Sequence, residues 1–122
     1  MAKEDRAVQE IARDEFVHKW HSGEPFILID VLPHEHFLRV HLPRAINVPV
    51  NLLHDLAPLL FGQHDQLVVY CSNSACQASA TAAKILMLLG YDNVLDYAGG
   101  ILDWEEGGLP VIREAVQQER AA

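Results

Sequence analysis

Short runs of apolar residues alternate along this chain with longer segments in which apolar and polar positions recur at helical spacing. The runs at residues 26–31 and 67–70 are almost wholly apolar and have the length of strands, and shorter runs lie at residues 10–12, 45–48 and 93–96. Strands that are apolar on both faces are typical of a parallel sheet between layers of helices. We therefore expect a three-layer α/β fold with a central, mainly parallel sheet flanked by helices.

The segments between these runs predict the helices of the outer layers. The stretch at residues 78–89 is rich in alanine and leucine, and Gly90 follows it at the position where many helices end in left-handed backbone. A proline inside the expected helix at residues 52–60 predicts a break near Pro58. Further helices are expected at residues 13–22, 35–40 and 111–120, and Gly99 and Gly100 are expected to turn the chain into a short segment at residues 101–105.

No internal repeat and no linker rich in glycine or serine divides the chain. Its 122 residues, half of them apolar, suffice for one domain with a sizeable core. We therefore expect a single domain over residues 1–122, with a core over about residues 10–111 and a polar C-terminal helix over about residues 111–120.

The charge of the chain narrows the classes of partner. Asp and Glu total 17 against 9 Lys and Arg, which gives a net charge of −8 and argues against nucleic acid and against anionic membrane surfaces. No apolar run approaches the roughly 20 residues of a membrane span, and the first residues lack the apolar segment of a secretory signal. We expect a cytoplasmic protein with reduced cysteines and no membrane partner.

Cys71 is the residue best placed for chemistry, because it stands where an apolar run ends and a helix is about to begin. Backbone N–H groups of the intervening turn and the positive end of the helix dipole both favour an anion such as a thiolate. We therefore expect a lowered pKa and a nucleophilic thiol. Asp30 ends another apolar run, where it can either accept N–H groups of the loop after Cys71 or cap the next turn.

Three segments, in order, resemble the single-domain rhodaneses, a family of sulfurtransferases. Residues 27–49 resemble the family signature DVR…E…GHIPGAINIP, and residues 68–71 resemble the strand that ends in the catalytic cysteine. Residues 99–111 resemble the C-terminal pattern GGI..W…GLPV. With the N-terminal helix, the resemblance covers about residues 10–111, and it implies a rhodanese-like fold.

The resemblance also implies a reaction. In this family the cysteine accepts a sulfane sulfur, which is a sulfur atom bound to another sulfur, and the resulting persulfide passes its outer sulfur to a nucleophile. By resemblance, Cys71 is the nucleophile, and the backbone N–H groups of the loop after it hold the anionic substrate. These loop residues are Ser72, Asn73, Ser74, Ala75, Cys76 and Gln77.

Departures from the family pattern bear on the substrate. Leu32 stands where the family usually has arginine, His36 stands where glutamate is common, and the loop between Cys71 and Ser79 has no basic residue. A dianion such as thiosulfate should therefore bind poorly, which favours a persulfide or polysulfide donor. Arg44, where the family prefers glycine, is a candidate replacement charge.

The loop after Cys71 is also longer than in the common short-loop rhodaneses, as it is in the related dual-specificity phosphatases. Those enzymes need an arginine that closes the loop on phosphate, whereas Cys76 and Gln77 stand at the corresponding positions here. Phosphatase activity is therefore not expected.

Cys71 and Cys76, the two cysteines of the chain, leave alternatives open. Cys76 can attack a Cys71 persulfide, release sulfide and leave a disulfide, or it can be an inert packing residue. Two thiolates are too few ligands for a metal ion, and no histidine lies at a recognised ligand spacing from them, so a metal is not expected. No cofactor is expected either. The expected function is a sulfurtransferase with a small sulfur-containing donor and a thiol or protein acceptor. A redox-sensing dithiol and a non-catalytic binding module are the alternatives.

Overall fold

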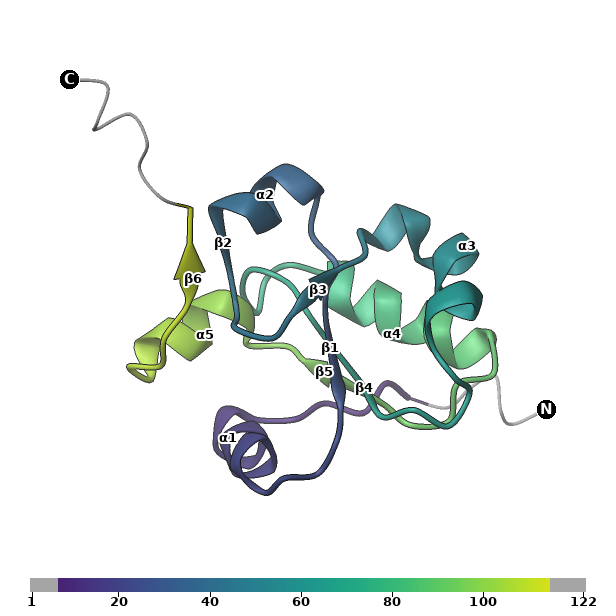
Figure 1. The fold of residues 1–122 in the computed structure, drawn as a ribbon, viewed down its shortest axis with the longest axis horizontal. Coiled ribbons are helices and arrows are strands. Elements are labelled where there is room, and N and C mark those ends of the chain that lie inside the picture. Colours follow the sequence, from purple (N-terminus) through teal and green to yellow (C-terminus); the bar gives the residue numbers. More distant parts are fainter. Residues whose placement is uncertain (1–6, 115–122) are drawn as a thin grey trace.

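The computed structural model describes residues 7–114, and its centre is a parallel sheet of four strands (Figure 1). In spatial order the strands are β3 (Ile46–Asn47), β1 (Ile27–Asp30), β4 (Leu67–Tyr70) and β5 (Val94–Tyr97). Glu10 adds one parallel bridge to Asp96 of β5. The expected parallel sheet is confirmed, and the apolar run at residues 10–12 contributes a bridge rather than a full strand.

Helices cover both faces of this sheet, as the continuously apolar strands predicted (Figure 1). On one face α3 (Val50–Leu60) packs against α4 (Ala78–Leu88), which also contacts β4 and β5. On the other face lie α1 (Arg13–His21) and α5 (Gly100–Glu106). The short helix α2 (His34–Arg39) leads into β2 (Val40–His41). This is the three-layer α/β arrangement expected from the sequence.

Two neighbouring residues of β5 show how the layers are separated, because consecutive side chains of a strand point to opposite faces of the sheet. Asp96 is buried towards α4, where its carboxyl group meets Ser79. Tyr97 points the other way, and its ring centroid lies 5.0 Å from that of Phe16 in α1 and 6.3 Å from that of Trp104 in α5. The core of the protein therefore continues on both sides of the sheet.

The helix α3 differs from expectation, because it begins at Val50 and runs unbroken through Pro58. Proline lacks the N–H that would bond to the carbonyl of His54, one turn earlier, but both residues are on the exposed side of the helix. Water can satisfy that carbonyl group, and Leu53 and Ala57 stay buried on the opposite side. The break predicted from the proline is therefore wrong.

The C-terminal segment also differs from expectation. Instead of beginning a helix at residue 111, the chain forms β6 (Ile112–Arg113), which pairs antiparallel with β2. Glu114 N–H donates to the carbonyl of Arg39, and the indole N–H of Trp104 donates to the carbonyl of Pro110 at 2.7 Å. These tertiary hydrogen bonds keep the segment extended, so the predicted helix is wrong for residues 111–113. The rest of the predicted helix lies outside the described residues.

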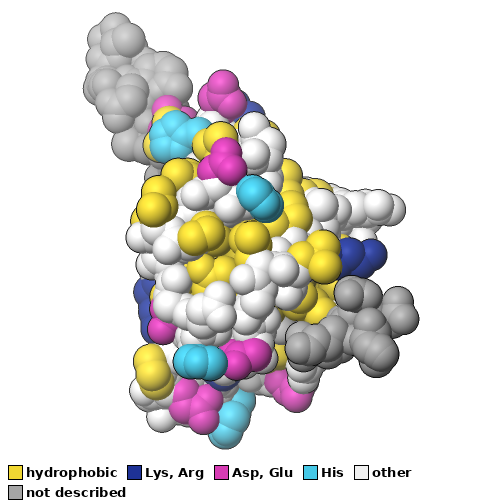
Figure 2. All heavy atoms as spheres, turned by 90° about the vertical axis from the view of Figure 1, so that its right-hand side faces the viewer, with side chains coloured by type: hydrophobic (Ala, Val, Ile, Leu, Met, Phe, Trp, Pro, Cys, Tyr) yellow, Lys and Arg dark blue, Asp and Glu magenta, His cyan; other side chains and the backbone are white. Residues whose placement is uncertain are grey.

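Exposed leucines lie on α3 and at the end of α4. Figure 2, which faces the side of the molecule on which α3 and α4 end, shows hydrophobic side chains gathered there. The exposed leucines of these helices are Leu52, Leu59, Leu60 and Leu88. Between residues 7 and 114, no helix is both long enough and apolar enough to cross a membrane.

Candidate active site

Cys71 and Asp30 lie at the same edge of the sheet, as predicted. Cys71 directly follows β4, Asp30 ends β1, and the register pairs Asp30 with Tyr70. Because α4 begins at Ala78, residues 72–77 form the loop that joins the strand to the helix. Cys71 and Asp30 each have 0% of their surface exposed. The candidate nucleophile is therefore in the expected place but is enclosed by other protein atoms.

The start of α5 anchors the first residues of the loop. Ile101 N–H donates to the carbonyl of Cys71 at 3.1 Å, and Leu102 N–H donates to the carbonyl of Ser72 at 2.9 Å. Gly100 adopts a φ of 66° at this contact, and a Cβ on Gly100 would lie 2.4 Å from the Cys71 carbonyl oxygen. A glycine is therefore required where α5 approaches the loop.

Asn73 shapes the rest of the loop by accepting two of its N–H groups. Its side-chain oxygen accepts Ala75 N–H at 2.9 Å, and its backbone carbonyl accepts Cys76 N–H at 3.0 Å. This turn brings Cys76 back to Cys71, whose thiol donates to the Cys76 carbonyl at 3.5 Å. Both cysteines are free. Within the loop, Ser72, Asn73 and Cys76 are half-buried, and Ser74, Ala75 and Gln77 are exposed.

Burial, together with the neighbouring Cys76 thiol, raises the pKa of the Cys71 thiol to about 11. The hydroxyl and the backbone N–H of Ser79 act in the opposite direction, because each donates to the Cys71 sulfur, but they do not outweigh burial. The predicted lowering of the Cys71 pKa is therefore wrong for this reduced structure. The sulfur lies deeper in the core than its position after a strand indicated.

Cys76 has the environment that the sequence suggested for Cys71. Burial raises the pKa of the Cys76 thiol, but hydrogen bonds from the Cys71 thiol, from Ala78 N–H and from the N–H and hydroxyl of Ser72 together outweigh burial and lower it. The hydrogen-bond donors of the loop and of the start of α4 therefore favour the thiolate of Cys76 rather than that of Cys71.

The model of the rhodanese-like domain matches residues 13–107, from the start of α1 to the end of α5. The chain belongs to the rhodanese-like domain family. The match includes β4, the loop and both cysteines.

Individual relatives support this assignment. The HTH-type transcriptional regulator Rv0324 of Mycobacterium tuberculosis is 37% identical over 101 residues, which are 83% of this chain and 43% of the regulator. A sulfurtransferase of Allochromatium vinosum is 29% identical over 105 residues, which are 86% of this chain and 95% of that protein. The human single-domain sulfurtransferase TSTD1 has the same fold, with a TM-score of 0.71 at 24% identity over 82% of this chain and 97% of that one. This chain thus spans less than half of the regulator it resembles.

The positions at which this rhodanese-like chain departs from the family pattern supply no positive charge to the thiols. Leu32 is buried, and Nδ1 of His36 is buried without a hydrogen-bond partner among the described residues. The guanidinium of Arg44 lies 4.8 Å from the ring centroid of Trp20 and 4.5 Å from that of Phe26. Phe26 precedes β1, at the end of the sheet opposite Cys71, so Arg44 is not the replacement charge.

Asp30 acts as a cap in this structure. Its side-chain oxygen Oδ1 accepts Leu32 N–H at 2.9 Å, which fixes the turn after β1. Burial raises the pKa of Asp30, although the hydroxyl of Tyr70 and Leu32 N–H act to lower it. The Tyr70 hydroxyl in turn accepts Leu42 N–H at 3.0 Å. Of the two roles considered for Asp30, these contacts favour the turn cap.

From the sequence, Ser79 can either bond back to the start of its helix or point toward the Cys71 sulfur, with the structural role favoured, and the sequence pattern does not single out Asp96. Ser79 in α4 lies between two groups, because it lowers the pKa of both the Cys71 thiol and the Asp96 carboxyl group in β5. Burial raises the pKa of Asp96, the Ser79 hydroxyl lowers it, and the charge of Glu10 raises it. The available signal was an acidic residue in a predicted buried strand, but only the packing of α4 on β5 relates it to Cys71.

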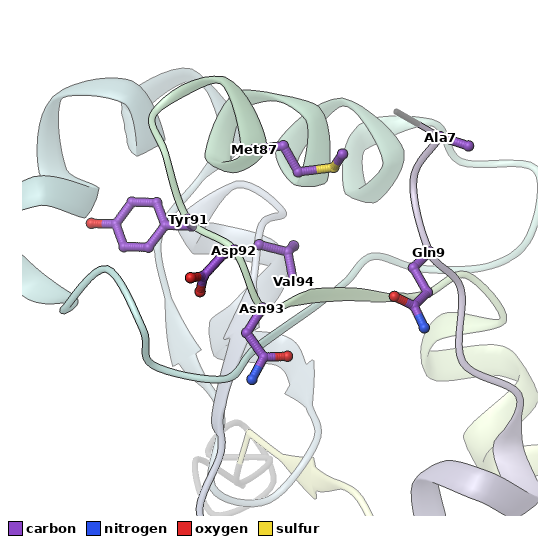
Figure 3. Close-up of a pocket in the computed structure, with 7 residues that line it drawn as sticks. All are labelled: Ala7, Gln9, Met87, Tyr91, Asp92, Asn93 and Val94. Atoms are coloured by element: carbon purple, nitrogen blue, oxygen red, sulfur yellow. The ribbon is translucent and has the colours of Figure 1, made fainter. Parts of the chain in front are cut away.

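Other features lie away from this edge. A cavity of about 60 Å³ is lined by residues near the end of α4 and the start of β5, including Met87, Tyr91 and Val94 (Figure 3). Val94 begins β5, so this cavity lies at the end of the sheet opposite Cys71. Among residues 7–114, no group of three or more His, Cys, Asp or Glu side chains is arranged to hold a metal ion.

Proposed function

We propose that this rhodanese-like domain transfers sulfane sulfur from a small donor to a thiol through a persulfide on Cys71. The observation that carries the proposal is the position of a free cysteine at the carboxyl end of β4, at the head of the loop that leads into α4. Ligands of parallel α/β sheets bind at this edge. The relatedness to sulfurtransferases supports the same reaction class.

The reaction has two displacement steps. The Cys71 thiolate attacks the sulfane sulfur of the donor, the sulfur–sulfur bond of the donor breaks, and the rest of the donor leaves as a thiolate. An acceptor thiolate then attacks the outer sulfur of the Cys71 persulfide and releases Cys71. The hydroxyl and N–H of Ser79 stabilise the Cys71 thiolate before the first step and after the second.

A donor can reach Cys71 only if the loop moves, because Cys71 is fully buried. The hydrogen bond between Ala75 N–H and the Asn73 side chain is one of the contacts that hold the loop in its closed form. In this proposal the N–H groups of residues 72–77 bind the donor and then the outer sulfur once the loop has opened. Asp30 supports the edge by fixing the turn after β1.

A persulfide or polysulfide is the favoured donor. Among the described residues, no lysine or arginine is one of the groups that shift the pKa of either thiol. The chain has a net charge of −8, so thiosulfate, a dianion, meets an unfavourable field without a local cation to offset it. The persulfide group itself carries at most one negative charge, so the reacting end of such a donor tolerates a site of neutral hydrogen-bond donors.

The acceptor is a small thiol or a cysteine of a partner protein. Two free cysteines fit the reducing cytoplasm expected from the sequence.

The test compares the reduced wild-type protein with Cys71→Ser and Cys76→Ser after incubation with glutathione persulfide or thiosulfate. Intact-mass spectrometry should show one added sulfur on Cys76→Ser with glutathione persulfide, much less with thiosulfate, and none on Cys71→Ser. No sulfur on Cys76→Ser with either donor would contradict the proposal and would leave a binding module with the rhodanese fold.

A further inference from the structure

The loop after β4 holds both cysteines of this chain, and the two residues are in contact. The Cys71 thiol donates to the Cys76 carbonyl at 3.5 Å, and the Cys71 side chain also lowers the pKa of the Cys76 thiol. The turn made by Asn73 fixes this approach, because Asn73 accepts the N–H groups of both Ala75 and Cys76. The contact is therefore part of the architecture of the loop.

The two sulfur atoms have different environments. Cys71 has 0% of its surface exposed, whereas Cys76 is half-buried. The N–H groups of Ala78 and Ser72 and the Ser72 hydroxyl lower the pKa of the Cys76 thiol. A cysteine that only fills space needs apolar neighbours, whereas a convergence of hydrogen-bond donors stabilises a thiolate. Cys76 is thus the more accessible thiol of the pair, and its surroundings favour the thiolate.

We propose that Cys76 is a resolving thiol that attacks the Cys71 persulfide and releases its outer sulfur as sulfide. This inference rests on the proposed function, because it requires that Cys71 first accepts a sulfane sulfur. It adds a second product and a second state of the protein, an oxidised loop, to the transfer reaction.

The chemistry balances without an external oxidant. The Cys76 thiolate attacks the Cys71 sulfur, a Cys71–Cys76 bond forms, and the bond between the Cys71 sulfur and the outer sulfur breaks. The outer sulfur leaves with the electron pair as hydrosulfide. The two cysteines are oxidised to a disulfide, and the sulfane sulfur is reduced to sulfide. A cellular thiol or dithiol reductant then returns the loop to the reduced state.

Geometry favours attack on the inner sulfur over transfer of the outer sulfur to Cys76. In the reduced loop the Cys71 sulfur already lies 3.5 Å from the carbonyl oxygen of Cys76, so the residue that attacks and the atom that it attacks start as neighbours. The outer sulfur of a persulfide extends one bond farther and is the leaving group of this displacement.

The test uses one equivalent of glutathione persulfide, no added reductant, and the same three proteins. Wild-type protein should release about one sulfide per chain and lose the mass of two hydrogens as the disulfide forms. Cys76→Ser should retain one added sulfur and release little sulfide until a reductant is added. Cys71→Ser should neither gain a sulfur nor release sulfide. Because the chain has no third cysteine, every change in mass is assigned to this pair.

The outcomes separate the two proposals. If wild-type protein keeps the added sulfur and releases no sulfide, the resolving role of Cys76 is wrong while the Cys71 persulfide stands. If a disulfide forms without sulfide, the pair is oxidised directly and the resolving role is again wrong. If Cys76→Ser takes up no sulfur, the proposed function itself fails.

Discussion

Gly100 at the start of α5 lies directly against the carbonyl oxygen of Cys71: a Cβ on Gly100 would stand 2.4 Å from that oxygen. The same backbone segment donates Ile101 N–H to this carbonyl. The contact joins α5 to Cys71, the residue that precedes the loop. The position of the loop therefore depends on a helix about 30 residues later in the chain.

We expect Gly100→Ala to destabilise the protein and to disturb the loop. The substitution adds a steric clash to a left-handed φ of 66°, and together these should cost about 3 kcal/mol in the free energy of unfolding. Gly108→Ala is the matched control, because Gly108 has a φ of 77° but open space around its Cβ position. Its cost should be about 1 kcal/mol. Equal losses in denaturant unfolding would show that the contact with Cys71 is unimportant.

We expect Gln77→Arg to improve the use of thiosulfate. Gln77 is exposed at the end of the loop, so a larger side chain fits there, and a guanidinium supplies the cation that the loop lacks. A charge-assisted hydrogen bond of about 1.5 kcal/mol would raise kcat/KM for thiosulfate roughly tenfold. Gln77→Met controls for side-chain length without charge. A similar gain in both variants, measured by sulfur transfer to cyanide, would refute the charge explanation.

Ser79→Ala should make Cys71 less reactive, because the Ser79 hydroxyl lowers the pKa of the Cys71 thiol. Losing a hydrogen bond to a thiolate of about 1.5 kcal/mol should reduce the alkylation rate by iodoacetamide roughly tenfold. The measurement is made in a Cys76→Ser background, where Cys71 is the remaining thiol. Ser74→Ala, at an exposed loop position, should leave the rate unchanged. An unchanged rate in Ser79→Ala would remove Ser79 from the site.

Asp96→Asn should stabilise the protein at neutral pH. Burial raises the pKa of Asp96 above its ordinary value of 3.8, so the folded state binds the proton more tightly than the unfolded state does. The stability that this carboxyl group contributes is therefore present below pH 3.8 and is lost as the pH rises through the folded-state pKa. The gain from the neutral amide should be on the order of 1 kcal/mol at pH 7 and should disappear in acid.

Urea unfolding of Asp96→Asn at several pH values checks this expectation. Asp55→Asn is the control, because the Asp55 side chain is 83% exposed on α3. Its effect on the free energy of unfolding should be small at every pH. A loss of stability at pH 7 in Asp96→Asn would mean that the carboxylate, held by Ser79, is a net stabilising group.

Much of the fold follows from local patterns. The run at residues 67–70 coincides with β4, and the strand predicted at residues 93–96 is displaced by one residue in β5. Gly90, with a φ of 100°, follows α4 as expected for a helix end. These features depend on apolar runs of strand length and on the backbone freedom of glycine, both of which are visible in a window of a few residues.

The errors arise where distant parts of the chain decide the outcome. A helix was expected after residue 110, but pairing of β6 with β2 overrides local preference. Pro58 lies on the solvent side of α3, and this could not be known before the buried side was fixed. Asp96 joined the site only because α4 packs on β5 and brings Ser79 to it.

The sequence by itself determined the parallel sheet, the edge at which Cys71 and Asp30 lie, and the family, because apolar runs and motif spacing are properties of order along the chain. Only the tertiary structure decided which of the two sulfurs is buried and which is surrounded by hydrogen-bond donors. The depth of a side chain and the direction of an N–H group depend on what packs against the loop, here α5 and α4, and no local pattern encodes that.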